Sequence, residues 1–295
     1  MSEVAQEPNE YVQFWNNILA DKFERFRHIL MRGLSYHSDI PLQALRVKPG
    51  SNILDVGCGW GDTAIQLAHL TGPEGRVLGL DCCDAFLDKG RMDAARERLD
   101  NLGFITADVE RYAFQPEYDL VFSRFGMMFF QNPVVAMKNI RRALKPGGKL
   151  VFIVWRQLED NPWLGLPKNI VLRHLPPPSD NAQTCGPGPF SMSSADLVSA
   201  QLKAAGFDTR VRFDRNDGPV MVGHSTEEAM QFQLALGPAG EVFREAGPEA
   251  EKKREQIEAD LREALSRYQT ESGEIVMQSS SWTITAYNGT ATDKS

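Results

Sequence analysis

The sequence predicts an α/β protein built on a doubly wound, mostly parallel sheet with helices on both faces. Over residues 52–155, short apolar segments alternate with segments of helical period. Repeated crossover connections of this kind make a parallel sheet. The apolar segments are almost continuous instead of alternating with polar residues, which indicates strands that are buried on both faces.

The elements expected between residues 10 and 155 follow one another in a regular order. Residues 10–38 carry apolar and aromatic side chains at helical spacing, and Gly33, Pro41 and Pro49-Gly50 are expected to lead out of this helix. The five strands expected next are Asn52–Val56, Arg76–Leu80, Phe104–Ala107, Tyr118–Ser123 and Lys149–Trp155. The helices expected among them are Asp62–Leu70, Asp84–Leu99 and Val134–Leu144.

The pattern loosens after Trp155, where prolines crowd residues 156–192. Ser193–Ala205 is predicted as a helix with a Ser193/Asp196 capping box, ended by Gly206. Phe207–Phe213 alternates like a strand, residues 225–270 are helical, and Ser280–Tyr287 is a final strand. The expected organisation is an N-terminal helical cap (1–45), a ligand-binding core (46–155), an insertion with the C-terminal part of the core (156–224), a helical insertion (225–278), and a final strand with its tail (279–295).

Composition and charge exclude several classes of protein. The chain has 32 Lys and Arg against 39 Asp and Glu, a net charge of −7, so it has no overall attraction to nucleic acid or to anionic membranes. Its apolar runs are strand-length, far below the roughly 20 residues of a membrane span, and its polar start lacks a secretory signal. The four cysteines have neither disulfide nor zinc-site spacing. We therefore expect a reduced, cytoplasmic protein without a metal.

The most informative segment is the glycine-rich turn Asp55-Val56-Gly57-Cys58-Gly59-Trp60-Gly61, between a strand and a helix. Glycines let the backbone approach a ligand closely, and the helix N–H groups point at it. In a dinucleotide fingerprint the third glycine follows the second by three residues. Here it follows by two, and the carboxylate of Asp55 opposes a pyrophosphate but suits a cationic amino-acid group. The alternative is a tight turn that binds nothing.

Two further carboxylates end the next two strands. Asp81 ends the second strand, where a carboxylate can accept both hydroxyls of an unphosphorylated ribose. Asp108 ends the third strand and can accept from an adenine amino group. Each acid alone is as well explained as a turn or capping residue, and Asp84 could equally cap the helix that it opens. Together with the glycine turn, three acids at consecutive strand ends form a much more specific constellation.

The segments ILDVGCGWG, VLGLD, ITADV, YDLVFSRFG and LKPGGKL, in this order and spacing, resemble the class I S-adenosylmethionine-dependent methyltransferases. The resemblance is strongest to the branch of the ubiquinone/menaquinone-biosynthesis type, which acts on small molecules, and it covers residues 52–155. It implies a Rossmann-like sheet of seven strands with helical lid insertions, in which Phe207–Phe213 and Ser280–Tyr287 are the two C-terminal strands. It also implies S-adenosylmethionine as the cofactor.

The resemblance implies a set of cofactor-binding residues at the strand ends and in the N-terminal helix. They are Tyr11 and Trp15 over the cofactor; Asp55, Gly57, Gly59, Gly61 and Thr63 at its methionine part; Asp81 at its ribose; Cys82, Phe86, Asp108 and Val109 at its adenine; and Ser123, Arg124 and Phe125 at the sulfonium and the substrate entrance. The insertions 156–192 and 214–278 are expected to roof the acceptor pocket. Aromatic residues outside the motifs either line this pocket or form the cores of the insertions.

The catalytic residues stay open at this point. Methyl transfer needs proximity, alignment and exclusion of water, and a general base only where the acceptor carries a proton. His28 and His37 are candidate bases, although the favoured reading of each is a partly buried or surface histidine without a catalytic role. Arg124 binds a substrate anion or pairs with Asp119 or Glu117. The predicted function is methyl transfer to a small, partly apolar molecule. The alternatives are a nicotinamide-dependent oxidoreductase and a non-catalytic S-adenosylmethionine-binding protein.

Overall fold

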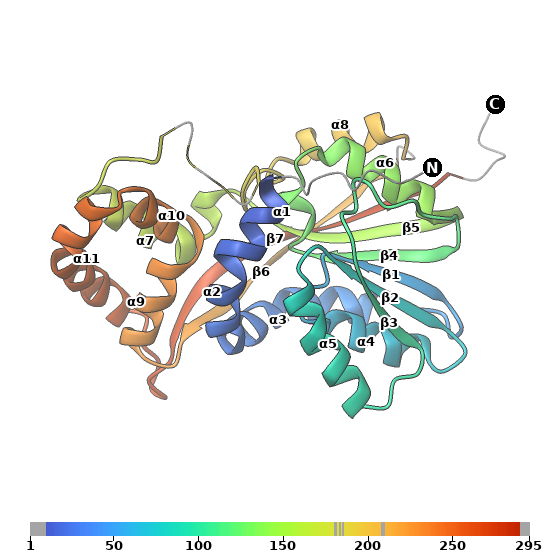
Figure 1. The fold of residues 1–295 in the computed structure, drawn as a ribbon, viewed down its shortest axis with the longest axis horizontal. Helices are drawn as coiled ribbons and strands as arrows, with labels where there is room; N and C mark the ends of the chain where they lie inside the picture. The colour runs from blue at the N-terminus through green and yellow to red at the C-terminus, as the bar shows by residue number, and fades with distance from the viewer. Residues whose placement is uncertain (1–9, 180–181, 183, 185, 208–209, 290–295) are drawn as a thin grey trace.

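The centre of the molecule is one seven-stranded sheet (Figure 1), seen in a computed structural model that describes residues 10–179, 182, 184, 186–207 and 210–289. The strands are β1 (Asn52–Val56), β2 (Arg76–Asp81), β3 (Leu102–Thr106), β4 (Tyr118–Arg124), β5 (Leu144–Trp155), β6 (Arg212–Gly223) and β7 (Ile275–Tyr287). Their order is β3-β2-β1-β4-β5-β7-β6. The first five are parallel, and β7 runs antiparallel between β5 and β6. The Rossmann-like, doubly wound α/β fold expected from the sequence is confirmed.

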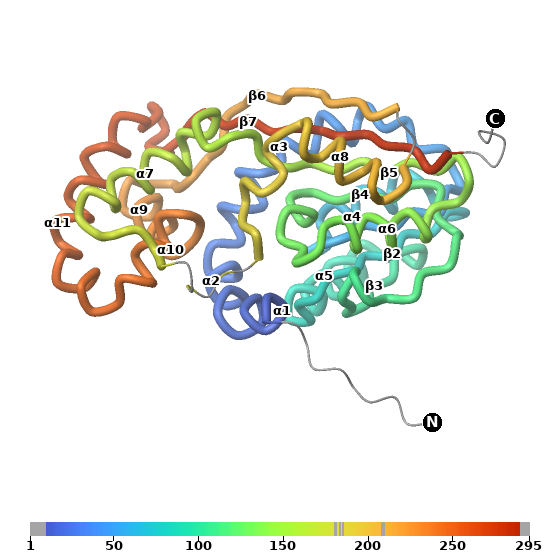
Figure 2. Tube along the Cα trace, turned by 90° about the horizontal axis from the view of Figure 1, so that it is seen from above, coloured from blue at the N-terminus to red at the C-terminus, as the bar shows by residue number. Residues whose placement is uncertain are grey.

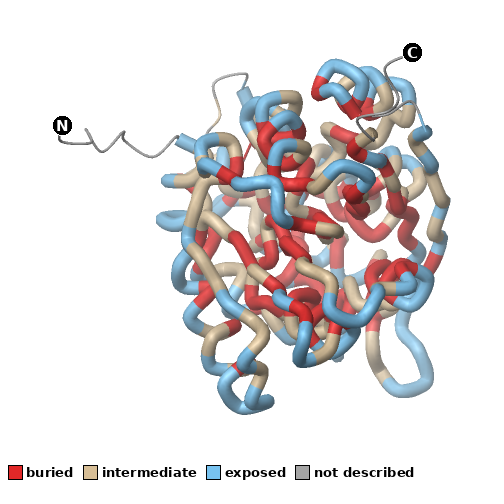
Figure 3. The backbone as a smooth tube through the Cα atoms, turned by 90° about the vertical axis from the view of Figure 1, so that its right-hand side faces the viewer, coloured by how far each residue is buried: buried red, intermediate tan, exposed pale blue. Residues whose placement is uncertain are grey.

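Helices cover both faces of this sheet (Figure 1). One face carries α3 (Arg27–Ala44), α4 (Asp62–Thr71) and α5 (Asp84–Arg96), and the other carries α6 (Pro133–Ala143) and α8 (Ala195–Ala205). Burial on both faces explains the continuous apolar strands, since Ile53, Leu54 and Val56 are all fully buried. Buried positions fill the interior, and exposed positions follow the periphery (Figure 3).

A helical lobe stands beside the sheet, at the end of β6 and β7 (Figure 1, left). It consists of α7 (Pro162–Leu172), α9 (Thr226–Ala235), α10 (Gly237–Glu245) and α11 (Pro248–Ser266). Three N-terminal elements lie between this lobe and the sheet (Figure 2). They are α1 (Glu10–Phe14), the π-helix Trp15–Leu19 and α2 (Ala20–Arg25). Short 3-10 helices occupy Met127–Phe129 and Leu158–Asp160.

The N-terminal helix differs from its expected form. It is broken after Arg25, and its second part, α3, continues through Gly33 and Pro41 to Ala44 instead of ending near residue 38. The reason is close packing, because α3 crosses β6 at Gly33. A Cβ at Gly33 would lie 2.6 Å from the carbonyl oxygen of Met221. Glycine therefore serves contact with the sheet here and does not end the helix.

The C-terminal strands also differ from the expected ranges. β6 begins at Arg212 and includes residues 214–223, which the sequence assigns to the insertion, and β7 begins at Ile275. β6 is an edge strand. Such a strand tolerates a proline such as Pro219, because the missing backbone N–H can lie on the side that pairs with no other strand. The N–H of Phe207 instead donates to Leu202 O, at 3.1 Å, and closes the end of α8.

Two smaller expectations at the helix ends are corrected. The N-cap of α8 is Ser194 and not Ser193, since its hydroxyl accepts the N–H of Leu197. Asp84 does not cap α5; its carboxylate accepts from Thr106 and Arg91 instead. Among the described residues, no helix combines the length and the apolar character of a membrane span.

Candidate functional site

A cavity of about 290 Å³ lies where the carboxyl ends of the strands meet the N-terminal helices and the helical lobe. The sheet reverses its winding between β1 and β4, because β2 and β3 follow on one side and β5 on the other. Open α/β sheets bind their ligands outside the strand ends at such a point. The cavity is therefore the candidate site, and the following residues are described by their place in it.

The glycine-rich turn forms one wall. Gly57 and Gly59 line the cavity in the left-handed region, with φ of 65° and 54°, where only glycine is free of strain. The N–H groups of Gly57 and Cys58 both donate to Leu80 O, at 2.7 and 3.1 Å, and so hold the turn against the end of β2. A Cβ at Gly59 would meet no atom within 4 Å. The bare backbone thus borders open space.

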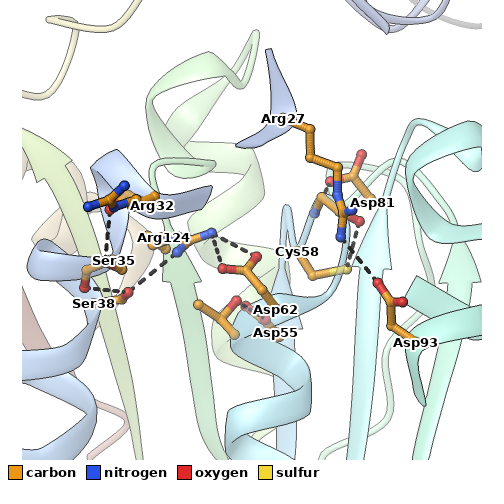
Figure 4. Close-up of polar contacts among 12 residues, drawn as sticks. Arg27, Arg32, Ser35, Ser38, Asp55, Cys58, Asp62, Asp81, Asp93 and Arg124 are labelled. Atoms are coloured by element: carbon orange, nitrogen blue, oxygen red, sulfur yellow. Dashed lines mark hydrogen bonds and ion pairs between the residues drawn. The ribbon is translucent and has the colours of Figure 1, made fainter. Parts of the chain in front are cut away.

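Asp81 is held beside this turn (Figure 4). Its Oδ2 accepts the N–H of Gly59 at 2.8 Å, and its Oδ1 accepts the N–H of Cys83 at 3.0 Å. Burial raises the pKa of Asp81, and interactions with the backbone of Cys83 and Gly59 and with Cys82 oppose this rise. A carboxylate oxygen has two lone pairs, so each oxygen can still accept from a ligand. Asp81 also lines the cavity.

Asp55 lies below the turn and is fully buried. Its Oδ2 accepts from the Thr63 hydroxyl at 2.6 Å, and its Oδ1 has no hydrogen-bond partner among the described residues (Figure 4). Burial raises the pKa of Asp55 to about 7, although Thr63 and Arg124 both act to lower it. Neither Asp55 nor Thr63 lines the cavity. Asp55 can therefore act on a ligand by its charge, across the turn.

Arg124 is paired on the opposite wall, but with an unexpected partner. Its Nη2 lies 2.7 Å from the Asp62 carboxylate, and its Nη1 donates to the Ser38 hydroxyl at 3.4 Å (Figure 4). Asp119, one of the two expected partners, binds Lys145 instead. The reason is position, since Asp119 and Arg124 lie near opposite ends of β4. Asp62 directly follows the last glycine of the turn, so the pair joins the ends of β1 and β4.

Aromatic rings form most of the remaining wall. Phe125 and Trp155 stack with ring centroids 4.0 Å apart and an interplanar angle of 17°. Phe125 has a φ of 58°, which costs a non-glycine residue about 1–3 kcal/mol. Trp163 of the lobe contacts Trp155 edge-on at 5.2 Å. The strained Phe125 thus presents a flat aromatic surface at the end of β4.

The N-terminal elements close the cavity on another side. Trp15, in the π-helix, packs edge-on against Phe129 at 5.2 Å and against Phe23 at 5.0 Å. The Asn16 amide donates to Cys82 O at 3.1 Å and so joins the π-helix to the end of β2. π-helical turns occur frequently at functional sites. Tyr11 and Trp15 both line the cavity, in the place expected for a cover.

The lobe adds a polar pair at the far end of the cavity. Glu241 and Arg244, one turn apart on α10, both line it. Arg244 also lies over the ring of Phe14, 4.9 Å from its centroid, and pairs with Glu245 at 2.9 Å. The cavity is therefore largely apolar, with charged groups near the strand ends and near α10.

Both histidine candidates lie outside the cavity lining. His37 is fully buried between the hydroxyls of Ser281 and Ser279, at 2.8 and 2.7 Å, and burial lowers its pKa to about 4. His28 faces Glu228 on the outer surface. Neither imidazole reaches the cavity, so the geometry gives no ground for either as a general base.

The cysteines of the cavity are protonated. Cys58 and Cys82 line it, and burial raises the pKa of both thiols above the ordinary range. A thiol held protonated is a poor nucleophile and a poor metal ligand. Cys58, Cys82 and Cys83 are free, and Cys185 lies outside the described residues.

Most of the residues expected from the sequence meet in this cavity. Those that line it are Tyr11, Trp15, Gly57, Gly59, Asp81, Cys82, Phe86, Asp108, Val109, Arg124 and Phe125. Those that lie behind its lining are Asp55, Gly61, Thr63 and Ser123. Lining residues that the sequence analysis did not single out include Phe23, Asp62, Phe232, Glu241 and Arg244. The position of Asp62 directly after the glycine-rich turn was a signal in the sequence. The residues of the lobe carried no such signal.

Comparison with known proteins finds matches to the core. Residues 53–148 match the family model described as a methyltransferase domain. A demethylmenaquinone methyltransferase of Staphylococcus carnosus is 35% identical over 111 residues, which cover 37% of this chain and 45% of the relative. The ubiquinone/menaquinone biosynthesis C-methyltransferase UbiE of Cupriavidus metallidurans is 36% identical over 137 residues, covering 40% and 54%. The chain thus spans about half the length of these curated relatives.

A solved structure shows the same fold over nearly the whole chain. It is the phosphoethanolamine N-methyltransferase 2 of Haemonchus contortus, in complex with phosphomonomethylethanolamine and S-adenosylhomocysteine. The TM-score is 0.58 at 16% identity, and the match covers 95% of this chain and 60% of that one. At this identity the likeness establishes the fold alone.

Proposed function

We propose that this chain, whose residues 53–148 match the model of a methyltransferase domain, transfers a methyl group from S-adenosylmethionine to a small, partly apolar molecule. The observation that carries the proposal is one cavity that joins a bare glycine backbone and the held Asp81 carboxylate to an aromatic wall. The glycine backbone and the Asp81 carboxylate suit a nucleoside that carries an amino-acid group. The aromatic wall suits an apolar acceptor.

The residues at the strand ends fit S-adenosylmethionine. Asp81 offers free lone pairs where a ribose diol would lie, and Asp108 and Val109 line the cavity next to it, at the end of β3, for the adenine. The open space beside Gly59 suits the methionine part, and the ionised form of Asp55 below the turn suits its ammonium group. When bound, this cofactor supplies a methyl group on a positively charged sulfur.

The chain's own contribution is binding, orientation and exclusion of water. The Phe125–Trp155 stack orients an acceptor at the end of β4, and aromatic faces also tolerate a nearby cation. Trp15 and Phe129 keep water out from the N-terminal side. The Arg124–Asp62 pair holds the two walls at a fixed separation. We assign no general base, because neither histidine candidate reaches the cavity.

The acceptor class follows from the rest of the lining. The lobe-facing part is apolar, apart from Glu241 and Arg244 at its end, so we propose a small acceptor with an apolar body and at least one polar group. Demethylmenaquinone, for which the Staphylococcus carnosus relative is named, is one acceptor of this kind to test.

Titration calorimetry tests the cofactor. S-adenosylmethionine and S-adenosylhomocysteine should bind and NAD should not. Asp81→Ala should weaken S-adenosylhomocysteine about ten- to a hundredfold, since a charge-assisted contact contributes roughly 1.5–3 kcal/mol. The matched control is Asp84→Ala, an exposed carboxylate three residues on, which should bind as the wild type does. Unchanged affinity in a folded Asp81→Ala variant would contradict the assignment, and preferential NAD binding would favour the oxidoreductase.

Turnover is tested separately. Release of S-adenosylhomocysteine is measured across a panel of small acceptors that includes demethylmenaquinone. Release that depends on one acceptor supports methyl transfer. Cofactor binding without release on any acceptor would favour the non-catalytic alternative.

A further inference from the structure

Two histidines and a glutamate from distant parts of the chain meet on the outer surface, away from the cavity. His28 belongs to α3, His224 follows β6, and Glu228 lies in the first turn of α9. Their ligand atoms, one from each side chain, all lie within 4.8 Å of one another. The rings of His28 and His224 are nearly parallel, with centroids 5.7 Å apart and an angle of 8°. Three metal-binding groups therefore converge on one point.

A second layer of contacts orients these groups. Glu228 Oε1 lies 2.8 Å from His28 Nε2, and its Oε2 accepts the backbone N–H of His224 at 2.7 Å. Glu274 Oε1 lies 3.4 Å from His224 Nδ1 and 2.6 Å from Arg32 Nη1. Glu274 is thus close to the second imidazole and is itself held by Arg32. Supports of this kind orient metal ligands in known sites.

We propose that His28, His224 and Glu228 bind a divalent zinc ion. Zinc takes imidazole nitrogens at 2.0–2.1 Å and carboxylate oxygens at 2.0–2.2 Å, so tetrahedral ligand atoms lie about 3.3 Å apart. The separations found here, from 2.8 Å to 4.8 Å, bracket that value. A water would fill the fourth position, while Glu274 supports His224 from behind. Two imidazoles favour zinc and its transition-metal neighbours over magnesium or calcium, which prefer oxygen ligands.

The site is open enough to load and to adjust. The side chains of His28 and His224 are 50% and 46% exposed, and that of Glu228 is 28% exposed. An ion can enter from solvent, and modest rotamer changes can shorten the longer separation. The cysteine and histidine spacings of the sequence gave no sign of this site, because nearly two hundred residues separate its two halves.

Other histidine–carboxylate pairs on the surface are simpler. His69 lies 2.7 Å from Glu97, and His174 lies 2.8 Å from Asp260. Across the described parts of the chain, only the group at His28 brings three ligand-bearing side chains together. A hydrogen bond is enough to explain two side chains that meet, whereas a metal site needs at least a third ligand from the protein. The two simpler pairs also provide matched controls.

An ion bound at this site would connect α3 and α9, two helices that line the cavity, from their outer side. α3 contributes Leu30 and Leu34 to the lining, and α9 contributes Phe232. His28 precedes Leu30 on α3, and Glu228 lies one turn before Phe232 on α9. Zinc would therefore fix α3 to the helical lobe. This role is independent of the methyl donor.

The test is zinc binding by the full, untagged chain, measured by titration calorimetry and by the visible absorption of added cobalt(II). We expect about one ion per chain, a tetrahedral cobalt spectrum, and a melting temperature that rises with zinc concentration. His28→Ala and His224→Ala should each weaken zinc by at least about tenfold, and Glu274→Gln by about ten- to a hundredfold if it acts through His224. Affinity should also fall at acidic pH, because zinc needs neutral imidazoles.

The controls are His69→Ala and His174→Ala, which should bind zinc as the wild type does. The proposal is overturned if zinc does not bind, if His28→Ala and His224→Ala bind it unchanged, or if the controls weaken it equally. Because both proposed histidines are about half exposed, their alanine variants should fold, and near-UV circular dichroism verifies this.

Discussion

At the scale of single residues, Asp55 is a carboxyl group without exposed surface and with one unpaired oxygen among the described residues. Its ordinary pKa of 3.8 is raised to about 7 by burial. Between these two values the folded chain holds a proton that the unfolded chain has lost. The free energy of unfolding must therefore fall as the pH rises from about 4 to 7, and level off above.

The variant Asp55→Asn removes this proton while it keeps the shape of the side chain. Between pH 5 and pH 8, the free energy of unfolding should fall less in Asp55→Asn than in the wild type. The two falls should differ by as much as a few kcal/mol. Urea denaturation across that range measures the difference. Asp119→Asn is the control: burial raises the pKa of Asp119, but its Lys145 and Asn52 contacts outweigh this and lower it. Asp119 therefore does not titrate in this range. Parallel curves for wild type and Asp55→Asn would contradict the raised pKa.

The site residues that could be predicted well from the sequence are those that lie at the end of a predicted strand. Asp81 and Asp108 reach the cavity because parallel strands end at one edge of a sheet. Burial is not visible in this way, so the sequence could not show that His37 is enclosed by two serines. Nor could it show that Arg124 pairs with Asp62, since that contact depends on how β1 and β4 lie side by side.

At the scale of elements, the contact between α3 and β6 depends on Gly33. Alanine in a helix interior usually stabilises by up to about 1 kcal/mol relative to glycine. At Gly33 its Cβ would lie 2.6 Å from Met221 O and 3.3 Å from a Val220 methyl. Overpacking of this kind costs about 1–3 kcal/mol. We therefore expect Gly33→Ala to destabilise the chain by roughly 1–2 kcal/mol, which reverses the usual sign.

Chemical denaturation of Gly33→Ala measures this change. The control is Gly103→Ala in β3, where the nearest atom, Leu78 Cδ1, would lie 3.8 Å from the new Cβ. We expect that control to stay within about 0.5 kcal/mol of the wild type. A Gly33→Ala protein as stable as the wild type would mean that α3 can move off β6 at no cost.

The sequence predicted β1 to β4 well, including the edge strand β3, and predicted β6 at the other edge poorly. β1 to β4 were placed to within two residues, because short apolar runs between turn residues have few other readings, whereas β5 begins at Leu144, five residues before its expected start. β6 was placed too early because an edge strand tolerates charge and proline, as at Arg215, Asp217 and Pro219. The helix break after Arg25 carries neither glycine nor proline, and only tertiary packing explains it.

At the scale of the whole molecule, the cavity belongs to no single part of the chain. The strand ends supply its polar wall, the N-terminal elements cover it, and the helical lobe lines its remaining side. Phe232 and Arg244 therefore had no sequence signal, because their place in the site exists only once the lobe is folded against the core. A site shared by three parts can widen along any of their boundaries.

The N-terminal boundary is the one that we expect to open. α1 and the π-helix rest on the core through the Asn16 amide, which donates to Cys82 O, and through the packing of Trp15 on Phe129. Lids come from the least stable segments of a fold and gain order when a ligand is bound beneath them. Amide hydrogen exchange over residues 10–25 should therefore slow when S-adenosylhomocysteine is added. α11, on the far side of the lobe and outside the cavity lining, is the reference and should exchange at the same rate in both states. Equal protection of residues 10–25 with and without ligand would instead make Tyr11 and Trp15 fixed anchors of the helix, and would move the entrance to the boundary between the lobe and the core.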